Sequence, residues 1–357
     1  MFEYTSKRCR KCLLQEDPSR GLLLDETGLC PLCRSYQPVE RNWEALETRF
    51  NERVNALKKG EKYDAVLMMS GGKDSAYLAY LLTQKMKLNI LGVTIDNGFE
   101  YSETFEKAEL LAKEMNIDHE LLHLPAHDSS RFYRFLISTP GLMEKDFGQI
   151  CLYCGRYLLE SGCSFAEQHK IPALFVGYNP EQLFGMGKTL EIEIDALRRQ
   201  QQKAIAGRIT YLFTQMEHEA KKHQDRSFIP HFREDIQTDV ICPFLYLPYR
   251  PQEIMETALQ KTRWEPISSF ASEHYIASGC KLLKLMAALA KINHVSSYMD
   301  YEFSAQVRAG ELDPHELKKY YSALEEPEEF YQSVLQQLGL DSSLETLAQL
   351  PFQRSTP

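Results

Sequence analysis

Residues 70–75 of the chain read Ser-Gly-Gly-Lys-Asp-Ser, and they directly follow the apolar run Ala65–Met69. Glycine adopts positive φ angles and lets a backbone approach an anion closely. A helix that begins near Asp74 directs free N–H groups and the positive end of its dipole at the same point. Lys73 adds a positive charge, and the serines at both ends add hydroxyl donors. The segment therefore predicts a phosphate-binding loop between a strand and a helix.

Cysteine spacing points to a second kind of chemistry near the amino terminus. Cys9 and Cys12 form one CxxC pair and Cys30 and Cys33 form another, at the separation typical of a zinc ribbon. Four thiolates suit tetrahedral Zn²⁺ and leave no coordination position open. We therefore expect this zinc site to be structural.

A third CxxC pair, Cys151 and Cys154, precedes a helix that we expect to begin near Gly155. The dipole of a helix favours the thiolate form of a cysteine at its start. Two cysteines need further ligands to hold a metal, and Cys242 and Cys280 are the candidates. Three interpretations stay open. In the first, Cys151, Cys154 and Cys242 hold a [4Fe-4S] cluster with one open iron. In the second, they are redox thiols that carry a persulfide. In the third, the CxxC pair only helps to pack the loop of the active site.

Strands and helices alternate from about residue 62 onward, which predicts a mostly parallel sheet with helices on both faces. Ligands of such sheets bind beyond the carboxyl ends of the strands, where residues 70–75, 96–98 and 177–179 all lie. The expected strands are 63–69, 89–95, 119–124 and 173–176. The expected helices are 43–59, 74–86, 103–115, a helix closing at 162–169, 191–222, 252–262, 280–291, 314–324 and 326–338.

Composition limits the class of protein. The chain has 357 residues, 43% of them hydrophobic, and a net charge of −9. None of its apolar runs reaches the roughly 20 residues that a membrane span needs, and its first residues do not resemble a signal peptide. We therefore expect a cytoplasmic protein without a membrane partner. The acidic balance favours a small-molecule substrate, and makes tRNA a less favoured partner.

The motifs together resemble the PP-loop ATP pyrophosphatase superfamily, whose SGGxDS pattern is matched at residues 70–75. The resemblance extends to one branch, which contains N-acetyl sugar amidotransferase-like and sulfurtransferase proteins with an N-terminal zinc ribbon. Its CxxC…DExGxCxxC pattern is matched from Cys9 to Cys33, and its VTxDNG pattern by residues 93–98. Loose matches continue to about Leu317.

This resemblance implies a doubly wound α/β fold of the HUP/PP-loop type. The implied domains are a zinc ribbon at 1–40, an ATP pyrophosphatase core at 41–245 and a helical carboxyl-terminal region at 246–357. Catalytic roles are implied for Lys73, Asp74, Cys151 and Cys154. The residues implied to bind the nucleotide are Ser70, Gly71, Gly72, Lys73, Asp74, Ser75, Val93, Thr94, Ile95, Asp96 and Gly177.

The implied reaction uses ATP with Mg²⁺ and adenylates an oxygen atom of the substrate, with release of pyrophosphate. A nucleophile then displaces AMP. With sulfur as nucleophile, a sulfur donor protein is the implied partner, and Cys151 or Cys154 carries the sulfur. With ammonia, the chain is an amidotransferase acting on an N-acetyl sugar and a glutaminase is the implied partner. We favour sulfur because of the core cysteines. A homodimer is compatible with the helical carboxyl-terminal region.

Overall fold

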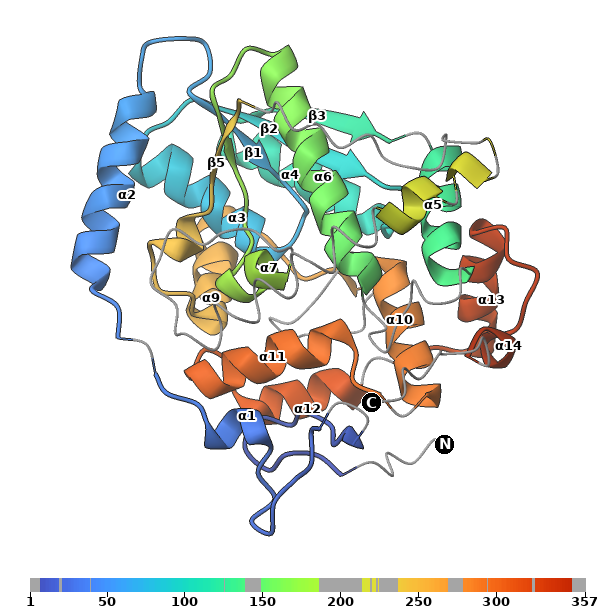
Figure 1. Ribbon diagram of the computed structural model, residues 1–357. Coiled ribbons are helices and arrows are strands. Elements are labelled where there is room, and N and C mark those ends of the chain that lie inside the picture. The colour runs from blue at the N-terminus through green and yellow to red at the C-terminus, as the bar shows by residue number, and fades with distance from the viewer. Residues whose placement is uncertain are drawn as a thin grey trace.

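The computed structural model describes residues 7–18, 21–38, 40–124, 126–138, 149–185, 214–218, 220–222, 224, 237–268, 279–293, 295–322 and 325–348. Within this part, a five-stranded sheet has the order β3-β2-β1-β4-β5, and every neighbouring pair is parallel (Figure 1). The strands are β1 (Ala65–Met68), β2 (Ile90–Asp96), β3 (Asp118–His123), β4 (Ala173–Phe175) and β5 (Asp239–Ile241).

The helices of the amino-terminal half are α1 (Pro31–Arg34), α2 (Trp43–Leu57), α3 (Lys73–Tyr80), which continues as a π-helical turn (Leu81–Lys85), α4 (Ser102–Met115), α5 (Ala126–Ser138), α6 (Gln149–Gln168) and α7 (Pro180–Gly185). The later ones are a 3₁₀ turn (Pro243–Leu245), α9 (Pro251–Thr262), α10 (Lys281–Ile292), α11 (Tyr298–Ala309), α12 (Pro314–Ser322), α13 (Glu328–Gln337) and α14 (Leu344–Ala348).

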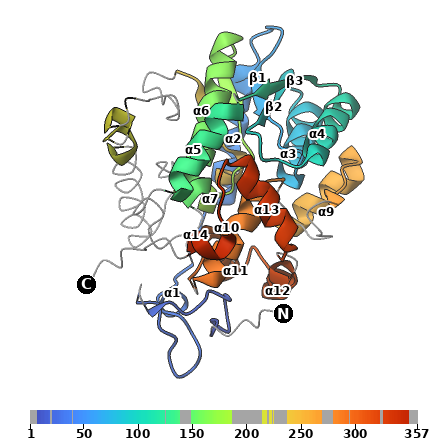
Figure 2. The same ribbon diagram turned by 90° about the vertical axis from the view of Figure 1, so that its right-hand side faces the viewer.

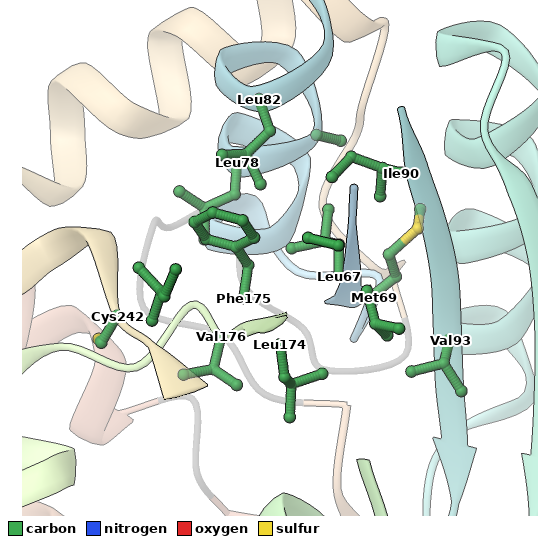
Figure 3. Packing of buried hydrophobic residues seen from close by; sticks show 14 of the residues in the cluster. Leu67, Met69, Leu78, Leu82, Ile90, Val93, Leu174, Phe175, Val176 and Cys242 are labelled. Atoms are coloured by element: carbon green, nitrogen blue, oxygen red, sulfur yellow. The ribbon is translucent and has the colours of Figure 1, made fainter. Parts of the chain in front are cut away.

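Helices cover both faces of the sheet. Figure 2 shows α6 on one side of the sheet and α3 and α4 on the other. All four residues of β1 and most of β2 are apolar, as expected of central parallel strands that are buried on both faces. Their side chains meet those of α3 and β4, as Leu67, Leu78 and Phe175 illustrate in Figure 3. The predicted α/β fold is therefore confirmed.

The carboxyl-terminal helices pack in two groups. Helices α10, α13 and α14 share a hydrophobic cluster with α5 and the start of α6. Helices α11 and α12 share another cluster with the four amino-terminal cysteines. The segment before α10 also joins the sheet region, because Glu100 and Cys280 form an isolated antiparallel bridge. The helical region therefore contacts both the segment that contains the four amino-terminal cysteines and the loop that follows the carboxyl end of β2.

The predicted strands and most of the predicted helices are confirmed to within a few residues. The predicted helix at 191–222 lies largely outside the described residues. The expected start of a helix near Gly155 is wrong, because α6 begins at Gln149. Ile150 and Tyr153 are buried against the cluster of α10, and this packing at helical spacing extends the helix. Strand β5 and helices α1, α5, α7, α11 and α14 are not in the sequence-based prediction. No helix of the described part is long and apolar enough to cross a membrane.

Candidate active site

The loop at residues 70–72 joins the carboxyl end of β1 to α3. Gly71 has a φ of +69°, and a Cβ atom there would lie 2.5 Å from the carbonyl oxygen of Thr104. Only glycine satisfies both the angle and this contact. Gly72 is the N-cap of α3 and provides no side-chain hydrogen bond. The first N–H groups of α3 therefore stay available to an anion.

Trp264 covers the loop from the end of α9. Its indole Nε1–H donates a hydrogen bond of 2.7 Å to the carbonyl oxygen of Gly71, and the residue is only 6% exposed. Helix α9 also packs along α3. The carboxyl-terminal part of the chain therefore supports the shape of the loop.

Lys73 and Asp74 begin α3 and contact each other. The Nζ atom of Lys73 donates to Asp74 Oδ2 at 2.7 Å and to the hydroxyl of Tyr249 at 3.2 Å. Asp74 Oδ1 is buried and has no hydrogen-bond partner in the described part of the chain. A buried carboxylate oxygen without a partner is costly, and a cation removes this cost. The pair fits a phosphate group at Lys73 and a magnesium ion at Asp74, since Mg²⁺ prefers oxygen ligands.

A cavity of about 310 Å³ opens on this loop at the carboxyl ends of the strands. Its size is at the lower end of the roughly 300–1,000 Å³ that small-molecule sites occupy. The other walls come from β2, from α4 and the residue Glu100 before it, from α6, α7 and the loop after β4, and from the segments after α9 and before α10. The sequence-predicted residues that line it are Ser70, Gly71, Gly72, Lys73, Asp74, Ser75, Val93, Thr94, Ile95 and Gly177.

Asp96 is the one sequence-predicted nucleotide residue that is not among the lining residues of this cavity. Its Oδ1 accepts from the backbone N–H of Gly98 at 2.7 Å, and its Oδ2 contacts His123 Nδ1 at 3.0 Å. Both contacts are those of a residue that stabilises the turn after β2. Asp96 therefore lies at the turn after β2, outside the lining of the cavity.

Cys151 and Cys154 lie inside the first turns of α6. Cys154 Sγ contacts the hydroxyl of Tyr133 at 3.0 Å and receives the side-chain N–H of Asn97 at 3.7 Å. Burial raises the pKa of the Cys151 thiol to about 12 and that of the Cys154 thiol to about 11. Desolvation therefore outweighs the helix dipole, and both residues are thiols at neutral pH.

The structure does not gather Cys242 with this pair into a group of ligands. Among the described residues, only the four amino-terminal cysteines form a group of three or more metal-ligating side chains within 4.8 Å of one another. Cys242 instead donates to the carbonyl oxygen of Tyr178 at 2.6 Å. Cys280 lies closer to the pair, because it packs with Cys154 against the same hydrophobic cluster. Burial, and then the negative charges of Glu100 and Cys154, raise the pKa of the Cys280 thiol.

Two desolvated carboxyl groups near the site, those of the half-buried Glu100 and the buried Glu302, do not stand out in the sequence. Glu100 lines the cavity, and burial raises its pKa to about 7. Glu302 of α11 accepts from the side-chain N–H of Asn179 at 2.9 Å, and burial raises its pKa to about 7 as well. Perturbed carboxyl groups of this kind are typical of functional sites. Glu100 directly follows the Asp-Asn-Gly-Phe turn, which is the only local signal for it.

The amino-terminal cysteines form a compact group of sulfur atoms. The Sγ atoms of Cys9 and Cys33 are 3.7 Å apart, as are those of Cys12 and Cys30. A tetrahedron of sulfur atoms about 2.3 Å from a zinc ion has edges of about 3.8 Å, so the geometry fits zinc. Cys9 Sγ also accepts the backbone N–H of Cys30 at 3.3 Å, a contact that orients a metal ligand.

No family model matches the chain. Over 117 residues it is 31% identical to the uncharacterised protein MJ1599 of Methanocaldococcus jannaschii, a match that covers 32% of this chain and 42% of that protein. The chain therefore spans less than half of the length of this curated relative.

Three solved structures are similar to the chain at low identity. U34-tRNA thiolase NcsA from Methanococcus maripaludis, with its [4Fe-4S] cluster, has 15% identity and a TM-score of 0.37 over 93% of this chain and 88% of that one. NMN synthetase from Francisella tularensis has 11% identity and a TM-score of 0.37 over 85% and 99%. NH₃-dependent NAD synthetase from Campylobacter jejuni has 14% identity and a TM-score of 0.31 over 64% and 99%. Likenesses this distant carry no information on the reaction.

Proposed function

We propose that the chain is a PP-loop ATP pyrophosphatase that adenylates an oxygen atom of its substrate. The observation that carries this proposal is the cavity at the end of β1. It combines a glycine loop, the open N-terminus of α3, the charge of Lys73 and the unpartnered carboxylate oxygen of Asp74. The N–H groups and Lys73 are the donors that hold the phosphates of a nucleotide, and the carboxylate oxygen is a ligand for a magnesium ion that would accompany them.

In the proposed reaction, the acceptor oxygen attacks the α-phosphorus of ATP. The new oxygen–phosphorus bond forms as the bond between the α and β phosphates breaks, and pyrophosphate leaves with the electron pair. The N–H groups of α3 stabilise the charge that develops on the departing phosphates, and Lys73 exchanges Asp74 for a phosphate oxygen. Asp74 would hold the magnesium ion, which would neutralise phosphate charge.

Sulfur is the nucleophile that we favour for the second step. Cys154 does not line the cavity, but Asn97 links it to a residue that does: the side-chain nitrogen of Asn97 donates both to the Cys154 sulfur and to the cavity-lining carboxyl of Glu100. We propose that Cys154 carries a persulfide supplied by a sulfur donor protein. A cluster held by Cys151, Cys154 and Cys242 is the less favoured form, because the Cys242 thiol is engaged with Tyr178.

The four amino-terminal cysteines are proposed to hold a structural zinc ion, because their sulfur spacing fits one. This module packs on α11, and Arg308 of that helix donates to Cys12 Sγ at 3.5 Å. Glu302 on the same helix contacts Asn179, close to the cavity. The zinc module is thereby proposed to support the wall of the active site. We propose a small molecule as the acceptor.

The test uses the full chain, Mg²⁺ and ATP labelled in its α phosphate. The small-molecule fraction and the RNA fraction of a cell extract are added separately as acceptors, each with hydrosulfide or with ammonium. We expect AMP and pyrophosphate with the small-molecule fraction, and more AMP with hydrosulfide than with ammonium. AMP formation that needs ammonium would identify the amidotransferase instead, and release of ADP would contradict adenylation. The matched control is Lys73→Ala, which should abolish AMP formation.

A further inference from the structure

Thr104, in the first turn of α4, has a buried hydroxyl group that lacks a partner. The residue is only 3% exposed, and its Oγ1 atom makes no hydrogen bond within the described part of the chain. Burying a hydroxyl group without a partner costs free energy, so each such case in a folded protein calls for an explanation. Thr104 also lines the cavity at the end of β1. A ligand in that cavity can therefore supply the missing partner.

Glu100 brings a second oxygen atom to the same place. A Cβ atom on Gly279 would lie 2.4 Å from Thr104 Oγ1 and 2.7 Å from Glu100 Oε2. The two oxygen atoms are therefore no more than about 5.1 Å apart, which is the sum of these two distances. Hydrogen bonds between oxygen atoms span about 2.5–3.0 Å, so one ligand atom between the two can bind both. Glu100 and Gly279 line the cavity as Thr104 does.

The backbone holds this pair of oxygen atoms in place. Glu100 and Cys280 form an isolated antiparallel bridge, beside which the N–H of Tyr101 donates to the carbonyl oxygen of Gly279 at 2.8 Å. Any side chain at Gly279 would collide with both oxygen atoms, and glycine leaves room for them. The pair is therefore already formed on the wall of the cavity before a ligand binds.

The pair lies next to the loop that we propose to bind phosphates. A Cβ atom on Gly71 would lie 2.5 Å from the carbonyl oxygen of Thr104, so this one residue contacts the loop with its backbone and forms the pair with its side chain. The group of a nucleotide that is bonded to its phosphates is the ribose. The position of the pair therefore fits a sugar whose phosphates occupy the loop.

The topology points to the same group. In doubly wound folds that bind dinucleotides, the phosphates lie at the first strand–helix turn, and an acidic residue at the end of the second strand binds a ribose hydroxyl group. In this chain Asp96 ends β2, but its oxygen atoms contact Gly98 and His123, and it does not line the cavity. Glu100 is the next acidic residue along the chain, and it does line the cavity.

We propose that Glu100 and Thr104 bind a ribose hydroxyl group of the nucleotide. This inference rests on the proposed binding of ATP and adds to it the residues that recognise the sugar. The ribose hydroxyl donates to Glu100 Oε2 and accepts the O–H of Thr104, so one group gives both oxygen atoms a partner. A deoxyribose that lacks this hydroxyl leaves Thr104 unpaired. The pair therefore makes the cavity selective for ribonucleotides.

The experiment is a calorimetric titration of the full chain with MgATP and with the magnesium complexes of 2′-deoxy-ATP and 3′-deoxy-ATP. The wild type should bind one of the two deoxynucleotides at least about tenfold more weakly than MgATP, because that ligand loses two hydrogen bonds. This ratio of affinities is the ribose preference. It is taken within one protein, so a variant that is merely less stable does not imitate its loss.

Two variants remove one oxygen partner each. Thr104→Val removes the hydroxyl group and keeps the shape of the side chain, and Glu100→Met removes the carboxyl group and keeps its length. Each should lower the ribose preference at least about threefold, because the lost side chain and the lost ribose hydroxyl belong to the same hydrogen bonds. Thr104→Ser, which retains a hydroxyl group, should keep most of the preference.

Glu106→Gln is the matched control, because it removes an exposed carboxyl group from the same helix and should keep the full preference. Equal binding of all three nucleotides by the wild type would overturn the proposal. A preference that Thr104→Val and Glu100→Met both retain in full would also overturn it, because other residues would then bind the ribose. A wild type that does not bind MgATP would instead refute the proposed function, and this inference with it.

Discussion

Replacing Gly71 with alanine should lower the free energy of unfolding more than the same replacement at a glycine that has an equally positive φ but open surroundings. Gly71 has a φ of +69°, and its new Cβ would meet the Thr104 carbonyl oxygen at 2.5 Å. The left-handed conformation costs an alanine roughly 1–2 kcal/mol. Relief of the contact has to move the backbone of the loop or of α4, and overpacking of this kind costs roughly 1–3 kcal/mol. The sum is a loss of roughly 2–5 kcal/mol in the free energy of unfolding.

Gly310 provides the matched control. Its φ is +75°, and an added Cβ would meet nothing within 4 Å. Gly310→Ala should therefore lose only the conformational part, roughly 1–2 kcal/mol. Urea unfolding without nucleotide measures both losses. Calorimetric titration with MgATP measures the second consequence, because a displaced loop should weaken binding in Gly71→Ala at least tenfold, or about 1.4 kcal/mol. Equal losses in the two variants, together with unchanged MgATP binding in Gly71→Ala, would refute this reasoning.

Two further variants test the cysteine module and a buried carboxyl. Cys33→Ser removes one of the four sulfur ligands, so the zinc content of the purified protein should fall from one per chain to near zero, and the melting temperature should drop. A metal analysis that finds no change in zinc content would contradict a zinc site. Burial raises the pKa of Glu302 from 4.5 to about 7, so the folded state holds this proton more tightly and its contribution to stability is lost as the pH rises through about 7. Relative to Glu302→Gln, the wild type should lose up to about 3 kcal/mol of unfolding free energy between about pH 5 and pH 8. Urea unfolding of both proteins at both pH values measures this loss. A difference between the two proteins that stays constant with pH would exclude this account.

The local parts of the fold and of the site could be read from the sequence. The glycine loop, the strand before it and residues 93–95 of the next strand are contiguous patterns, and the parallel sheet brings them to one cavity. A strand that is buried on both faces and a helix that begins after a glycine turn need no distant contact to be recognised.

The contacts that complete the site are not local, and the sequence carries little signal for them. The indole of Trp264 reaches Gly71 across 193 positions, and nothing near Trp264 indicates this. The choice between Cys242 and Cys280 as the neighbour of the CxxC pair depends on how the segment before α10 pairs with Glu100. The early start of α6 likewise depends on packing against α10. Tertiary packing decides all three, and residue spacing does not record it.

The central claim is that the cavity at the end of β1 binds ATP through its phosphates. Calorimetric titration with MgATP of the wild type, of Lys73→Ala and of Lys85→Ala tests it most directly. Lys85 is an exposed lysine at the far end of the same helical segment, so its removal changes the net charge equally. The account predicts one nucleotide per wild-type chain, unchanged affinity in Lys85→Ala and at least tenfold weaker binding in Lys73→Ala, a difference of about 1.4 kcal/mol or more. A wild type that does not bind MgATP, or a Lys73→Ala variant that binds as tightly as Lys85→Ala, would contradict it.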